Sequence, residues 1–312
     1  MRFTPIMMVL YILIALMPSH VHAKIDAERV RPSDADKGVG DFYFENIVFN
    51  GKDDTRNAPL VVFLPGTGGG RDGGPELLME TVAKQGYRVI FLPYDDVPAV
   101  AQACPQRPPQ CSARFRAARV FGGEGPVSNP PSEGIVTRLV ALLRYLDHEH
   151  PNAGWGGFLA PDGGPAWPRI VMSGLSQGAG MAAFIAKRFP VRRVVLFSSP
   201  WDTFGPEQLP APWLAGRSAT PPWRWWAERH ARENTTRLLA QAYRVLGIPP
   251  GHLFLFDGDL PASAYGENPY HGSTVTSAEY VPQWRAMFGI AGSEPSSTET
   301  PPRPWRPTRL RP

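Results

Sequence analysis

The chain has few cysteines, little net charge and few long apolar runs, and each shortage excludes a class of protein. It has only two cysteines, and no histidine lies near them to complete a zinc site. The net charge of +4 is too small to indicate a nucleic-acid-binding surface. No second apolar span and no internal repeat follow the N-terminal region. With 43% hydrophobic residues, the composition indicates one large domain with a single core.

The first 23 residues are typical of a secretory signal peptide. Arg2 precedes an apolar run over residues 6–17, and the small residues Val21 and Ala23 stand where signal peptidase accepts them. The run is about half of the roughly 20 residues that a membrane-spanning helix needs. We therefore expect cleavage after Ala23 and export to the periplasm or the medium. Because these compartments are oxidising, Cys104 and Cys111 are predicted to form a local disulfide.

Short apolar runs alternate with segments of helical periodicity. Near-continuous apolar character predicts strands that are buried on both faces of a mostly parallel sheet. The predicted strands are 42–49, 58–65, 87–93, 169–174, 191–199 and 252–258, and the predicted helices are 75–84, 133–147, 179–188, 223–246 and 276–288. This alternation predicts an α/β domain over residues 24–291.

Three segments interrupt the pattern. Residues 97–131, rich in Pro, Gly and Arg, are expected to form a surface excursion. Residues 201–226 contain five tryptophans and are expected to form a cap-like insertion, which either lines an acyl pocket or packs on the core. Residues 292–312, rich in proline, are predicted to be a disordered tail. A membrane or cell-envelope contact by the arginines of this tail is the weaker alternative.

The stretch SGLSQGAG, residues 173–180, carries the strongest chemical signal. A predicted strand precedes it and a helical segment follows, so Gly174, Ser176 and Gly178 form the G-x-S-x-G pattern of a nucleophile elbow. Such a sharp turn lifts a serine hydroxyl above the sheet. Ser176 is therefore the predicted nucleophile.

A serine nucleophile requires a base, and His271 is the best placed histidine. It follows the last predicted strand, in what we expect to be a loop, whereas His148, His150, His230 and His252 are expected to be solvated or capping residues.

The base requires an acid that fixes its tautomer. Asp259, just past the end of the last predicted strand, is the favoured acid, because it reaches a loop histidine more easily than a residue within the strand. Asp257 in the same strand and Asp202 after an earlier strand are the alternatives.

Two backbone N–H groups should stabilise the oxyanion. The elbow supplies the amide of Gln177, and the glycine-rich turn GTGGG (66–70) supplies that of Thr67. This turn lacks the lysine and spacing of a phosphate-binding loop. No metal or organic cofactor is expected.

The combination of LPGTGGG, GLSQGAG, DGDL and NPYHG resembles the α/β-hydrolase superfamily. Within it, SQGAG and the short separation of Asp259 from His271 resemble cutinase-type serine esterases, although this chain is longer and carries the two insertions. The resemblance covers residues 58–288. It implies a mostly parallel central sheet flanked by helices, a triad of Ser176, Asp259 and His271, and an oxyanion hole of Thr67 and Gln177.

The predicted function is that of a secreted serine hydrolase that cleaves a small-molecule or polymeric carboxylic ester through an acyl-serine intermediate. An acyltransferase, a peptidase or a polymer depolymerase would use the same triad, because water and other nucleophiles compete for one acyl-enzyme. A non-catalytic protein that binds cell-envelope material is the alternative from another class.

Overall fold

The computed structural model describes residues 27–40, 45–49, 57–71, 74–106, 108–260 and 268–292, and the structural statements below concern these residues. The predicted signal peptide and all but the first residue of the predicted tail lie outside them. None of the helices in these ranges is long and apolar enough to cross a membrane.

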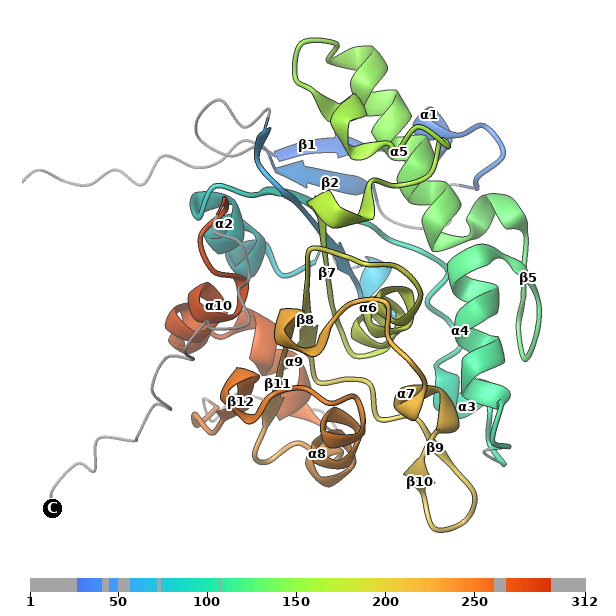
Figure 1. The fold of residues 1–312 in the computed structure, drawn as a ribbon, viewed down its shortest axis with the longest axis vertical. Helices are drawn as coiled ribbons and strands as arrows, with labels where there is room; N and C mark the ends of the chain where they lie inside the picture. The colour runs from blue at the N-terminus through green and yellow to red at the C-terminus, as the bar shows by residue number, and fades with distance from the viewer. Residues whose placement is uncertain are drawn as a thin grey trace, which may run out of the picture.

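An eight-stranded sheet runs through the molecule (Figure 1). Its order is β1-β2-β4-β3-β7-β8-β11-β12. The strands are β1 Ala27–Val30, β2 Asn46–Phe49, β3 Leu60–Leu64, β4 Arg88–Phe91, β7 Ile170–Leu175, β8 Arg193–Phe197, β11 Trp225–His230 and β12 Leu253–Phe256. Strand β2 is antiparallel to both β1 and β4, and every pairing from β4 to β12 is parallel. This mostly parallel sheet, flanked by helices, has the predicted α/β-hydrolase fold.

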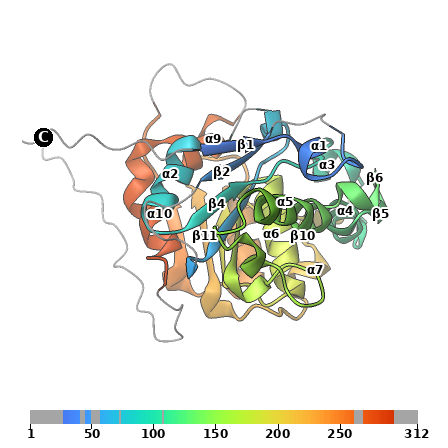
Figure 2. The same ribbon diagram turned by 90° about the horizontal axis from the view of Figure 1, so that it is seen from above.

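Helices cover both faces of the sheet, because alternate residues of a strand point to opposite faces. Leu60, Val62 and Leu64 pack on the side of α5 (Ile135–Glu149), α6 (Gln177–Arg188) and α8 (Thr236–Val245). Val61 and Phe63 pack on the side of α2 (Glu76–Lys84) and α10 (Val281–Phe288). Figure 2 shows α5 and α6 on one side of the strands and α2 and α10 on the other side.

The region predicted as one helix over 223–246 is instead a strand and a helix. Residues 225–230 form β11, which pairs in parallel with both β8 and β12, and α8 begins only at Thr236. Trp225 and Trp226 are buried in this strand, so they belong to the core of the sheet and not to a cap. The remainder of the tryptophan-rich segment holds a small hairpin, β9 Thr203–Phe204 with β10 Leu209–Pro210, and the short helix α7 (Pro212–Ala215).

The prediction of a surface excursion over 97–131 is also corrected. It contains the short helix α3 (Val100–Ala103) and α4 (Cys111–Phe121), whose Phe115 and Val120 are buried in the core. The arginines that suggested a solvated segment are in part buried as well, since Arg116 and Arg119 pair with acidic side chains. A two-residue hairpin, β5 Gly123–Glu124 with β6 Ser128–Asn129, follows.

Candidate active site

Ser176 occupies the junction between β7 and α6, in a strained backbone conformation. Its φ of 53° and ψ of −123° are unfavourable for a residue with a side chain, and such conformations persist only where the surroundings enforce them. The Ser176 N–H donates to Phe197 O, which ties the turn to β8.

The two glycines of the elbow are required by close backbone contacts. A Cβ on Gly174 would lie 2.6 Å from Leu64 O, and one on Gly178 would collide with the carbonyl oxygens of Leu64 and Pro65. No side chain fits at either position, so α6 can pack closely against the end of β3. The pattern Gly174, Ser176, Gly178 therefore has the local structure that the sequence predicts.

His271 bonds to Glu233, which is not among the acids predicted from the sequence. Its Nδ1 lies 2.9 Å from Glu233 Oε2. Because an ionised carboxylate only accepts hydrogen bonds, Nδ1 carries the proton of the neutral imidazole and Nε2 is left as the basic nitrogen. His271 lies in the first turn of α9 (Pro269–Thr276) and not in the predicted loop.

Glu233 is fully buried and is held by several donors. Its side chain is 0% exposed, and it lies in the turn between β11 and α8. Oε1 accepts from the His230 N–H at 2.8 Å and contacts Ser198 Oγ at 3.2 Å, while Oε2 lies 3.4 Å from Thr235 Oγ1 as well as contacting His271. These contacts fix the orientation of the carboxylate and hence that of the imidazole.

The sheet brings Ser176 and the Glu233–His271 pair to one edge. Leu175 is in register with Phe197, and Phe197 with Glu228, so the carboxyl ends of β7, β8 and β11 lie side by side. Ser176 directly follows β7 and Glu233 follows β11. No hydrogen bond joins the Ser176 hydroxyl to His271 within the described ranges, and such contacts are often long before substrate binds.

The three predicted acids lie elsewhere. The Asp259 side chain is 90% exposed and pairs with Arg232 at 2.6 Å, and Asp257 is also exposed. Asp202 is buried in an ion pair with Arg116. None of the three contacts His271 in the described part of the chain, so the prediction of its partner is corrected to Glu233. Ser176, Glu233 and His271 follow one another along the chain in the order predicted for nucleophile, acid and base, with glutamate in place of aspartate.

The glycine-rich turn lies directly against the nucleophile. A Cβ on Gly66 would be 3.0 Å from Ser176 Cβ. The N–H groups of Gly68 and Gly70 donate to the two carboxylate oxygens of Asp96, at 3.1 and 2.9 Å, and that of Gly69 donates to Gly66 O. The Thr67 N–H makes no hydrogen bond in the described part of the chain, and Thr67 is exposed, so this amide is available to a ligand.

Gln177 is linked to the loop that carries Asp96. Its Nε2 donates to Asp96 O at 2.7 Å, and its Oε1 accepts from Val100 N at 2.9 Å. As the first residue of α6, it has a backbone N–H without an intrahelical acceptor. Asp96 therefore connects the two segments that carry the predicted oxyanion donors, Thr67 and Gln177. The sequence analysis did not identify this residue.

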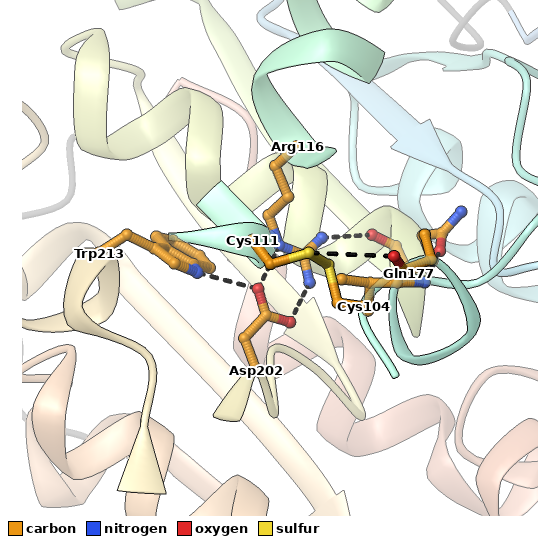
Figure 3. Close-up of a disulfide and its surroundings, with 8 residues drawn as sticks. Cys104, Cys111, Arg116, Gln177, Asp202 and Trp213 are labelled. Carbon is orange, nitrogen blue, oxygen red and sulfur yellow. Dashed lines mark hydrogen bonds and ion pairs between the residues drawn. A yellow bond between two sulfur atoms is a disulfide. The ribbon is translucent and has the colours of Figure 1, made fainter. Parts of the chain in front are cut away.

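A buried ion pair and a disulfide support the back of the elbow (Figure 3). Asp202 accepts from Arg116 through both oxygens, at 2.7 and 2.5 Å, and from Trp213 Nε1 at 2.9 Å. Arg116 Nη1 also donates to Gln177 O at 3.3 Å. The predicted disulfide between Cys104 and Cys111 is present and fixes the start of α4, the helix that carries Arg116.

Two histidines that were predicted to be solvated or capping residues are buried. His230 accepts from Arg232 N at Nδ1, its Nε2 lies 3.1 Å from Gly258 O, and burial lowers its pKa. His252 stacks on Trp226 with ring centroids 3.8 Å apart. His230 thus shapes the turn that presents Glu233. The described residues contain no cluster of three His, Cys, Asp or Glu side chains that could hold a metal ion.

Among the comparisons with known proteins, only that with solved structures gives matches. No family model matches the sequence, and no curated protein matches it. The apo form of Thermogutta terrifontis esterase 2 is 14% identical with a TM-score of 0.44, over 86% of this chain and 97% of that one. The sarin-phosphonylated form of that esterase is 16% identical with a TM-score of 0.44, over the same shares of the two chains. The propionate-bound form is 15% identical with a TM-score of 0.41, over 86% and 96%. Likenesses of this size carry no argument about function, which must come from the site itself.

Proposed function

We propose that this protein is an exported serine hydrolase that cleaves carboxylic esters through an acyl-serine intermediate, with Ser176 as nucleophile, His271 as base and Glu233 as acid. The observation that carries the proposal is the pairing of His271 with a buried Glu233 at the edge of the sheet where Ser176 occupies a strained elbow. The disulfide is compatible with export to an oxidising compartment. The proposed partner is a small-molecule or polymeric ester, and no cofactor is required.

In the acylation step, Ser176 Oγ attacks the ester carbonyl carbon while its proton passes to His271 Nε2. The carbonyl π electrons move to the oxygen, and the Thr67 and Gln177 N–H groups stabilise the resulting oxyanion. When this intermediate collapses, the bond to the leaving oxygen breaks and the alkoxide takes the proton from His271. An alcohol departs and the acyl group remains on Ser176.

Deacylation repeats the sequence with water as the nucleophile. His271 takes a proton from water, hydroxide adds to the acyl carbon, and the second intermediate expels Ser176 Oγ, which takes the proton back. The products are the carboxylic acid and the free enzyme. Glu233 stays ionised throughout, orients the imidazole and stabilises the imidazolium that forms in each half-reaction.

A fluorophosphonate probe tests the nucleophile directly. The purified protein is treated with the probe, and the adduct is located by peptide mass spectrometry, with Ser176→Ala and Ser218→Ala as matched variants. We expect a single adduct on Ser176 that the first variant abolishes and the second retains. If the folded protein forms no adduct on Ser176, the hydrolase proposal fails and a binding function takes its place.

A further inference from the structure

Glu228 is a buried carboxyl group that the proposed mechanism does not use. It lies in β11, five residues before Glu233, and is 0% exposed. No arginine or lysine forms an ion pair with it in the ranges that the structure describes, and its Oε2 has no hydrogen-bond partner there. The titratable groups that face it are the Glu233 carboxylate and the hydroxyls of Tyr243 and Tyr280. An ionised carboxylate in such surroundings would be strongly destabilising.

Ser198 lies between Glu228 and Glu233. Its Oγ is 3.3 Å from Glu228 Oε1 and 3.2 Å from Glu233 Oε1. A serine hydroxyl has one proton and can donate to only one of these oxygens. The other contact is a hydrogen bond only if the carboxyl group itself carries a proton. Both contacts are hydrogen bonds when one of the two carboxyl groups carries a proton in addition to that of the serine.

The arrangement of donors decides which carboxyl group is protonated. Glu233 is surrounded by the His230 N–H, the His271 Nδ1–H and the Thr235 hydroxyl, in addition to Ser198. Among the hydrogen-bond donors of the described residues, Glu228 faces only the Ser198 and Thr274 side chains and the Ser198 N–H, and the Thr274 hydroxyl already donates to His271 O. Because hydrogen-bond donors stabilise the charged form, Glu233 is the ionised member of the pair. Burial, together with the charge of Glu233, raises the pKa of Glu228 well above its ordinary value.

The backbone holds Ser198 in this position at a conformational cost. Its φ is 51°, a left-handed conformation that costs a residue with a side chain about 1 kcal/mol or more. The Ser198 N–H approaches Glu228 O at 3.4 Å, and Tyr243 OH, which donates to the same carbonyl, accepts from Ser199 N. The end of β8 is therefore locked to β11, with the Ser198 hydroxyl between the two carboxyl groups.

We propose that Glu228 is a neutral carboxylic acid that donates its proton to Ser198 Oγ, so that the Ser198 hydroxyl is committed to Glu233 and holds it beside His271. Glu228 and Ser198 are then positioning residues, and their effect on catalysis depends on the proposed function. The protonation state of Glu228 does not depend on the proposed function, and it can be measured in a protein that has no activity.

Infrared difference spectroscopy tests the proton on Glu228. Spectra at pH 7 are compared between Ser176→Ala, the same protein with Glu228→Gln, and the same protein with the exposed-site control Glu207→Gln. We expect a carbonyl band of a protonated carboxylic acid that Glu228→Gln removes and Glu207→Gln retains. Absence of that band at pH 7 overturns the proposal, whatever the fate of the hydrolase assignment.

The pKa of the His271 imidazole provides a second test in the same inactive background. Nuclear magnetic resonance follows its ring, which is identified by its loss in His271→Gln. Replacing a neutral Glu228 by Gln removes no charge, so the pKa should shift by less than about 0.3 unit. Removing an ionised Glu228 would take away a negative charge and lower the pKa of His271, which would contradict the proposal.

Rescue by the conservative variant tests the positioning role in the active enzyme. Glu228→Leu leaves Ser198 without its donor, so we expect kcat to fall about tenfold with little change in KM. Glu228→Gln keeps an N–H donor toward Ser198 and should recover most of that loss, with Ser198→Ala resembling Glu228→Leu. The positioning role would be refuted if Glu228→Gln and Glu228→Leu had equal thermal stability and lost the same share of kcat.

Discussion

Replacement of Glu233 by glutamine should abolish most of the activity through the tautomer of His271. Oε1 of Glu233 contacts two donors, the His230 N–H and the Ser198 hydroxyl. A glutamine would keep its carbonyl oxygen there and turn its NH₂ group toward His271. Nδ1 would then have to accept a hydrogen bond, the ring proton would move to Nε2, and Nε2, the proposed base, could no longer take a proton.

The expected loss follows from this wrong tautomer. Comparable changes of the acid in serine hydrolases lower kcat by about 10⁴-fold, and at 1.36 kcal/mol for each factor of ten this is about 5 kcal/mol of transition-state stabilisation. KM should change little, because Glu233 is fully buried and does not contact the substrate. Asp259→Asn is the matched control, since that side chain is 90% exposed and should alter kcat less than about twofold.

Kinetics with a short-chain nitrophenyl ester, together with thermal unfolding of each variant, would decide between the two acids. The reasoning is refuted if folded Glu233→Gln keeps more than about a tenth of the wild-type kcat. It is also refuted if Asp259→Asn loses more activity than Glu233→Gln, because the exposed aspartate would then be the acid in the working enzyme.

Three further predictions concern the supports of the site. Asp96→Ala removes the acceptor of Gly68 and Gly70, so kcat should fall about 10- to 100-fold and a transition-state analogue should lose affinity in parallel, as inhibition kinetics would show. The pKa of Glu228 is raised in the folded state above its ordinary 4.5, so its contribution to stability is complete below that pH and is lost as pH rises. Denaturation at increasing pH should therefore show the free energy of unfolding of Glu228→Gln rising relative to that of the wild type by about 1.4 kcal/mol per pH unit. Replacing both disulfide cysteines by serine should lower the free energy of unfolding by about 2 to 3 kcal/mol in urea titrations, given the sequence separation of seven.

The local structure around Ser176, the proposed nucleophile, could be predicted because its signal is local. The pattern of strand, turn and helix with Gly174 and Gly178 is contained in the eight residues around Ser176, although the backbone that excludes side chains at the two glycines belongs to the end of β3. The same holds for Cys104 and Cys111, which are close in sequence. Strands β3, β4, β7 and β8 could also be predicted, because they are mostly apolar and are buried on both faces.

The acid could not be predicted from local letters. Strand β11 reads WWAERH, and its buried Glu228 and His230 give it the composition of a half-exposed helix. It forms a strand because it pairs with β8 and β12, and this pairing brings Glu233 to the edge of the sheet. The choice of Asp259 assumed that the acid would follow the strand just before His271, whereas Glu233, the proposed acid, follows the adjacent strand β11. β1 was not predicted either, because only two of its four residues AERV are apolar and it pairs only at the sheet edge.

The four buried carboxyl groups of the described ranges, on Asp96, Asp202, Glu228 and Glu233, differ in how many donors they have. Asp202 has the Arg116 guanidinium and an indole N–H, Asp96 has two backbone N–H groups, and Glu233 has backbone, imidazole and hydroxyl donors. A buried negative charge is tolerated only where such donors replace water. Glu228 is the exception, because its neighbouring hydroxyls are also bound elsewhere, that of Ser198 to a carboxylate and that of Thr274 to His271 O. Three of these groups can therefore be ionised supports of the elbow, the oxyanion turn and the histidine, whereas the fourth fits the site only if it keeps its proton.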